Sequence, residues 1–121
     1  MWNRPRGSGT KHGNKKIVDT DGQKFDSIRE CGIYHDLCNL QAVGKIKDLK
    51  RQVPFVLAPS VKFAGDARAK PSLKFTSDFT YIENNIFIVA DAKSPHLRKE
   101  TAYRIRKHLM KSVHGLDILE L

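Results

Sequence analysis

Residues 76–94, TSDFTYIENNIFIVADAKS, decide how this chain is expected to fold. Two β-prone runs flank Asn84 and Asn85, and asparagine tolerates the left-handed backbone that a two-residue hairpin turn requires. Counting outward from that turn along both strands places Asp78 opposite Asp91, on one face of the sheet with their Cβ atoms about 5 Å apart. The sequence therefore predicts a hairpin that carries two facing carboxylates.

Two carboxylates placed so close repel each other unless one takes up a proton or a cation lies between them. Oxygen ligands at this separation suit Mg²⁺, with Mn²⁺ as a substitute. Lys93 follows Asp91 by two residues, so the period of a strand returns it to the same face. The alternative is a solvent-exposed face on which Lys93 forms an ordinary ion pair. The apolar run before Asp91 is typical of a central strand and favours a functional site.

The residues before this hairpin predict a small hairpin, a helix and an edge strand. An Asp21-Gly22 turn lies within residues 16–26, and Ser27 begins a helix that runs to about residue 43. Residues 52–57 indicate a strand, and Pro54 favours an edge position because proline donates no backbone hydrogen bond. Residues 58–72 are expected to form a long mobile loop.

After the hairpin, Ser94 and Pro95 are expected to begin a second helix that ends near Gly115. Its buried stripe is predicted at Ala102, Ile105 and Leu109, and residues 116–121 indicate a final strand. The predicted fold is α/β, with a mixed sheet of about four main strands flanked by two helices, in the order helix, strand, hairpin, helix, strand. Residues 17–121 are expected to form a single domain.

The composition favours a polyanionic partner. The 121 residues include 22 Lys and Arg against 13 Asp and Glu, a formal charge of +9, and such an excess attracts nucleic acid first and acidic membranes second. Residues 1–16 form a basic arm that is either a phosphate-binding segment or a solvated tail. No apolar run approaches the ~20 residues of a membrane span and no apolar signal segment is present, so a cytoplasmic protein without a membrane partner is expected. The candidate DNA-binding residues are Arg4, Arg6, Lys11, Lys15, Lys16, Lys62, Arg68, Lys70, Lys99, Arg104, Arg106 and Lys107.

Two other groups of residues have competing interpretations. Cys31, His35 and Cys38 lie along one predicted helix, a poor match to zinc-site spacing, so the cysteines are expected to be reduced and buried. Ser27 and Glu30 satisfy the capping-box pattern, which alone explains the glutamate. Glu30 also lies on the inward stripe of the helix, which would instead direct it at the sheet as a third carboxylate.

An acid on the first helix, an aspartate on one strand, and Asp91-X-Lys93 on the next resemble the PD-(D/E)XK nuclease superfamily. The likeness is greatest to its small phage-encoded members, which include endonuclease I of T7-type phages, a Holliday-junction resolvase, and related uncharacterised phage proteins. It covers roughly residues 25–121. The chain departs from the usual pattern at Ser77, where proline is common, and at Asp91, where close relatives often have Glu.

The resemblance implies a restriction-endonuclease-like core and Mg²⁺-dependent hydrolysis of phosphodiester bonds in branched or structured DNA, which in this superfamily leaves a 5′-phosphate and a 3′-hydroxyl. Asp78 and Asp91 would bind the metal, with Glu30 as a further ligand directly or through water. Lys93 would position or activate the attacking water, and Gln52 and Ser94 would lie beside the site.

Symmetric cutting of a junction further implies a homodimer, for which Tyr34, the N-terminal hairpin and the strand with Pro54 are interface candidates. A phage-encoded protein would act in the host cytoplasm. Two alternatives stay open: a non-catalytic DNA-binding protein of this fold, and a nuclease of this fold with another DNA substrate, as in nicking, transposon-end cleavage or host DNA cleavage.

Overall fold

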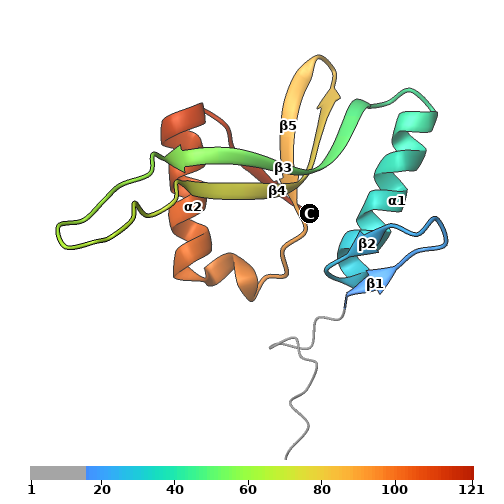
Figure 1. Ribbon diagram of the computed structural model, residues 1–121. Helices are drawn as coiled ribbons and strands as arrows, with labels where there is room; N and C mark the ends of the chain where they lie inside the picture. Colours follow the sequence, from blue (N-terminus) through green and yellow to red (C-terminus); the bar gives the residue numbers. More distant parts are fainter. Residues whose placement is uncertain (1–15) are drawn as a thin grey trace, which may run out of the picture.

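The computed structural model describes residues 16–121 (Figure 1). The predicted basic arm, with Arg4, Arg6, Lys11 and Lys15, lies outside the described residues apart from Lys16. The elements in chain order are β1 (Ile17–Val18), β2 (Lys24–Phe25), α1 (Ile28–Ala42), β3 (Lys47–Ala58), β4 (Leu73–Glu83), β5 (Ile86–Asp91), the 3₁₀ turn η2 (Leu97–Lys99), α2 (Thr101–His114) and β6 (Ile118–Glu120).

The main sheet has four strands in the order β3-β4-β5-β6. Its neighbours are antiparallel except β5 and β6, which are parallel and joined through α2. The predicted mixed α/β fold and the order of its elements are therefore confirmed. Pro54 lies on edge strand β3, as expected, although β3 is twice as long as the predicted strand.

The helices α1 and α2 pack on opposite faces of this sheet (Figure 1). Val89 and Ala90 are successive residues of β5, so their side chains point to opposite faces; Val89 belongs to the cluster around α2 and Ala90 to the cluster around α1. The first cluster comprises Leu57, Phe75, Val89, Tyr103, Met110 and Ile118, and the second comprises Leu37, Ile46, Phe79, Tyr81 and Ala90.

The start predicted for the second helix is wrong. Ser94 Oγ accepts a hydrogen bond from the N–H of Leu97, the first residue of η2, at 3.4 Å, and α2 begins only at Thr101. The predicted end is correct, because Gly115 adopts a left-handed conformation with φ 69° after the last helical residue.

The predicted buried stripe of α2 is also out of register. Tyr103 and Met110 are buried and Leu109 is half-buried, whereas Ala102 is exposed and Ile105 is 54% exposed. The 3₁₀ turn η2 before α2 sets which face of the helix meets the sheet. The spacing of apolar residues does not predict that turn.

Two smaller predictions about α1 have mixed outcomes. The helix begins after Ser27 as predicted. Cys31 and Cys38 have free thiols and are half-buried, where burial was predicted.

Among the residues described, no helix has the length and apolar character needed to cross a membrane.

Replacement of Ser27 by alanine is expected to lower the free energy of unfolding by about 1 kcal/mol. Ser27 Oγ accepts a hydrogen bond from the Glu30 N–H at 3.1 Å, so alanine leaves that donor of the first turn without its partner. Urea denaturation measures the change, and Ser27→Asp, which restores a capping oxygen, serves as the control. Equal stability of wild type and Ser27→Ala would show that this cap is dispensable.

Candidate active site

The β4–β5 hairpin has the register predicted from its turn. Glu83 pairs with Ile86, and the ladder continues to Phe79 opposite Ala90. Both turn residues, Asn84 and Asn85, adopt left-handed backbone conformations, with φ 52° and 65°. The next position along the two strands brings Asp78 beside Asp91.

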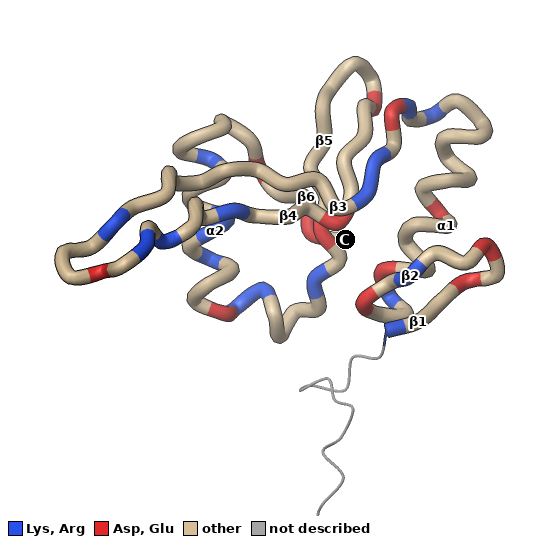
Figure 2. Tube along the Cα trace, viewed as in Figure 1, with Lys and Arg blue, Asp and Glu red and all other residues tan. Residues whose placement is uncertain are grey.

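Each of these two aspartates is held by the backbone of the opposite strand. The Asp78 N–H donates to Asp91 Oδ1 at 3.1 Å, and the Ala92 N–H donates to Asp78 Oδ2 at 2.8 Å. These reciprocal bonds hold one oxygen of each carboxylate against the backbone of the opposite strand. Figure 2 shows acidic segments gathered where β4, β5 and β6 meet next to the C-terminus.

Asp91 is a buried carboxylate with an unsatisfied oxygen. Its residue exposure is 2%, and Oδ2 has no hydrogen-bond partner. Burial and the neighbouring Asp78 carboxylate raise the pKa of Asp91 to about 7, although the charge of Lys93 opposes the rise. A buried carboxylate oxygen that accepts no hydrogen bond, beside a second carboxylate, is a place that a cation would stabilise.

Lys93 lies at this pair, as predicted, although β5 ends two residues earlier, at Asp91. Its Nζ is 3.6 Å from Asp91 Oδ2, close enough for an ion pair but too far for a hydrogen bond. The same ammonium lies 5.4 Å from the centre of the Tyr103 ring. The Tyr103 hydroxyl donates to Glu120 Oε2 at 2.7 Å, and burial together with this carboxylate raises the pKa of Tyr103.

Glu30 points at the sheet instead of turning back onto Ser27. Its carboxylate is buried, with Oε1 accepting hydrogen bonds from Arg51 Nη2 at 3.2 Å and from Gln52 Nε2 at 3.1 Å. Burial raises the pKa of Glu30 and the charge of Asp78 raises it further, against the hydrogen bond from Arg51. Ser27 therefore caps the helix, but Glu30 does not bond back to Ser27 as a capping box would require. Glu30 instead faces the sheet, as the second interpretation predicted.

The Gln52 side chain lies between two of the carboxylates, those of Glu30 and Asp78, and contacts both. Its Nε2 lies 3.1 Å from Glu30 Oε1 and 3.4 Å from Asp78 Oδ1. Arg51 pairs with Phe79 and Val53 with Ser77, so Gln52 lies opposite Asp78 across the β3–β4 ladder. Its φ of 53° is left-handed, a conformation that costs a residue other than glycine about 1–3 kcal/mol and that is found at functional sites.

The residue pattern did not predict the role of Arg51. Its guanidinium lies 4.0 Å from the centre of the Phe25 ring and bonds to the backbone oxygen of Lys24 as well as to Glu30. Arg51 thereby links the small hairpin β1–β2 to the Glu30 carboxylate. The only sequence signal was an arginine directly before Gln52, and nothing local indicated what it would contact.

The donor set fits a hard divalent cation such as Mg²⁺. Asp91 Oδ2 has no hydrogen-bond partner, and Asp78 Oδ1 has only the long contact from Gln52. Within residues 16–121, no three His, Cys, Asp or Glu side chains form a ready-made metal-binding group. Two carboxylates completed by water and phosphate oxygens are a usual arrangement for Mg²⁺, which retains several waters.

Apart from Lys16, which is exposed just before β1, the predicted DNA-binding residues of the described part occupy two exposed regions. Figure 2 shows Lys and Arg along the β3–β4 loop and along α2. Lys107 is partly engaged, because its Nζ lies 3.3 Å from Glu120 Oε1. The loop carries Lys62, Arg68 and Lys70, and the second region carries Lys99, Arg104, Arg106 and Lys107.

In the absence of divalent metal, the stability of the fold is expected to fall as the pH rises from about 4 to about 7. The folded-state pKa of Asp91, about 7, lies above its ordinary value of 3.8, so the folded chain holds a proton that the unfolded chain has already released. Glu30 acts in the same direction. Asp91→Asn should flatten this dependence in urea denaturation with EDTA, and Asp117→Asn, at an exposed site, should not. The same slope in wild type and Asp91→Asn would contradict the assignment.

Comparisons with known proteins identify a family. No curated protein and no solved structure matches the chain. Residues 9–115 match the model of a family described as a protein of unknown function, DUF1064. The match covers most of the chain and includes Glu30, Gln52, Asp78, Asp91 and Lys93. The chain therefore belongs to the DUF1064 family.

Proposed function

We propose that this protein is a metal-dependent endonuclease that hydrolyses phosphodiester bonds in branched DNA, with a core of the restriction-endonuclease type. The observation that carries the proposal is the Asp78–Asp91 pair with Lys93 beside it, at the end of a central strand. Charges are costly in such a place, and Asp91 Oδ2 has no hydrogen-bond partner to offset that cost. A divalent cation bound here would offset the cost of burying these carboxylates.

In this proposal Asp78 and Asp91 would hold Mg²⁺. The metal would supply Lewis-acid chemistry there, polarising the scissile phosphate and lowering the pKa of a bound water. Glu30 acts through Gln52, whose amide donates to both Glu30 and Asp78 and keeps the Asp78 carboxylate in place. Because Glu30 is already held by Arg51, we assign it an indirect role through the amide or a water.

Lys93 is the proposed partner of the reacting phosphate. Its ammonium is placed by Asp91 on one side and by the Tyr103 ring on another, and it is only partly exposed. From there it orients the attacking water and offsets the charge that develops on the phosphate oxygens. The water oxygen bonds to phosphorus as the bond to the 3′ oxygen breaks. The water gives up one proton and the departing 3′ oxygen takes one up, which leaves a 5′-phosphate and a 3′-hydroxyl.

The basic residues of the β3–β4 loop and of α2 would supply contacts to the DNA backbone. The residues described offer no base-reading motif, so recognition by the shape of the DNA is the more natural mode. Paired cutting of a junction requires two sites, and we propose a homodimer. Tyr34, one of the interface candidates, is half-buried, with its ring packed against Phe25 and Phe79.

Competition among substrates tests this function. Purified protein with Mg²⁺ is given a four-way junction, a flap, a nicked duplex and a linear duplex of shared sequence, and cleavage of the junction is expected to be fastest. Tight binding of DNA without cleavage of any substrate, in Mg²⁺ or Mn²⁺, would favour the non-catalytic alternative. Fastest cleavage of nicked or linear duplex would favour a nuclease with another task.

A further inference from the structure

The loop between β3 and β4, residues 59–72, extends from the body of the protein as an arm (Figure 1). Val61 and Lys70 form a β-bridge across it. Near the tip, the Phe63 N–H donates to Asp66 Oδ2 at 3.3 Å and the Asp66 N–H donates to the Phe63 oxygen at 3.0 Å. The predicted loop is therefore a hairpin-like arm with internal backbone and side-chain hydrogen bonds.

The arm presents an aromatic ring to solvent. Phe63 is 62% exposed and Val61 is 46% exposed. The two residues lie two positions apart on the same limb of the arm, and both are exposed to solvent. A single exposed apolar residue is common on protein surfaces, but this ring is attached to a backbone that is hydrogen-bonded on both its N–H and its carbonyl.

The arm that carries this ring also carries three exposed cations, Lys62, Arg68 and Lys70. Its one acid, Asp66, has Oδ2 at 4.0 Å from Lys70 Nζ. An exposed ring on a basic arm suits a ligand that has both a flat π surface and negative charge. A nucleotide has both features, because its base stacks on aromatic rings while its phosphate attracts Lys and Arg.

We infer that the arm recognises the branch of a DNA substrate by stacking Phe63 on an unpaired or unstacked base, with Lys62, Arg68 and Lys70 on the flanking phosphates. This inference rests on the proposed function. It identifies the unstacked bases at a branch point as the feature by which the proposed nuclease selects its DNA. Insertion of an apolar side chain at a base step is inexpensive where the bases are already unstacked, as at a branch point, and costly in a regular duplex. Phe63 therefore contributes to preference for branched DNA rather than to general DNA affinity.

Strand β4 leads from the arm to the site, and its length gives the separation between the base of the arm, at Leu73, and Asp78. Five residue steps of β4 separate Leu73 from Asp78, which at ~3.4 Å per residue is about 17 Å. That length equals about five nucleotide steps along one strand of duplex DNA. We expect the stacked base to lie about five nucleotides or more from the phosphate that is cut.

The test measures binding in EDTA of a four-way junction that carries 2-aminopurine at the branch, with a linear duplex of the same sequence for comparison. Phe63→Ser is expected to bind the junction about 5- to 100-fold more weakly and the linear duplex nearly unchanged. Wild-type protein should quench the 2-aminopurine fluorescence, and Phe63→Ser should not. Phe63→Trp should retain both properties, whereas Phe63→Leu, apolar but without a ring, should lose the quenching.

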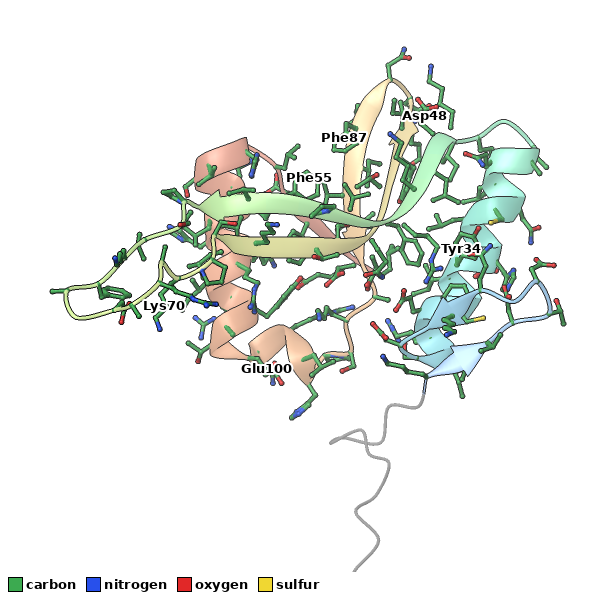
Figure 3. All side chains as sticks on the ribbon, viewed as in Figure 1. Tyr34, Asp48, Phe55, Lys70, Phe87 and Glu100 are labelled. Carbon is green, nitrogen blue, oxygen red and sulfur yellow. The ribbon has the colours of Figure 1, made fainter. Side chains whose placement is uncertain are left out.

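Phe87→Ser is the matched control, because Phe87 is 45% exposed on β5, away from the arm (Figure 3). It should leave junction binding unchanged. If wild type cleaves junctions while Phe63→Ser binds and quenches like wild type, the inference fails and the proposed nuclease stands. If wild type neither binds nor cleaves any of these DNAs, the proposed function fails and this inference fails with it.

Discussion

Asp78→Asn is expected to reduce Mg²⁺-dependent DNA cleavage by about 10³-fold or more, because it removes one of two carboxylates assigned to the metal. Asparagine has nearly the same shape, and its amide oxygen can still accept the hydrogen bond that the Ala92 N–H donates to Asp78 Oδ2. The fold should therefore persist, and so should DNA binding in EDTA. The variant separates loss of metal from loss of structure.

Metal binding itself is the second readout of this variant. Mn²⁺ should raise the melting temperature of wild type, since a ligand that binds only the folded state stabilises it, and should leave that of Asp78→Asn unchanged. Asp48→Asn is the matched control: Asp48 is exposed near the start of β3, and its φ of 57° is one that asparagine accepts readily (Figure 3). Cleavage by Asp78→Asn at the wild-type rate would remove Asp78 from the site.

Lys93→Met is expected to slow cleavage by about 10²- to 10⁴-fold and to leave the affinity for DNA in EDTA nearly unchanged. Methionine keeps much of the aliphatic length of the side chain but removes the ammonium, which lies 3.6 Å from Asp91 Oδ2 and 5.4 Å from the centre of the Tyr103 ring. Lys99→Met, at an exposed position on the same connecting segment, is the control for loss of one positive charge. It should affect binding slightly and the rate of the bound complex very little.

A pH profile distinguishes two roles for Lys93. Its charge opposes the rise in the pKa of Asp91, so its removal should raise that pKa above about 7. If Lys93 served only to keep Asp91 ionised, a higher pH would restore the activity of Lys93→Met. We expect the loss to persist at high pH, because the ammonium also acts on the reacting phosphate. Full recovery at high pH would contradict that part of the proposal.

The hairpin that carries the site could be predicted because its determinants are local. Two asparagines set the turn, the turn sets the register, and the register places Asp78 beside Asp91. Lys93 followed from the period of the strand, and Glu30 from its place on the inward stripe of a capped helix. Short-range backbone geometry was sufficient for each of them.

The contacts that support these side chains depend on segments that are distant in the sequence. Arg51 reaches back to Phe25 and Glu30, and the Tyr103 hydroxyl reaches forward to Glu120. The left-handed backbone of Gln52 is held by the β3–β4 ladder around it, not by a residue type that favours such a conformation. Tertiary packing determines each of these features, so no local pattern indicated them.

The rate at which a labelled four-way junction is cut by wild type and by Asp78→Asn, with and without Mg²⁺, tests the central claim most directly. The claim is that Asp78 and Asp91 hold a metal that hydrolyses DNA. It predicts cleavage by wild type only when Mg²⁺ is present and almost none by the variant, with both proteins folded and bound to the junction. Cleavage that proceeds equally in both proteins, or none by wild type in either Mg²⁺ or Mn²⁺, would contradict it.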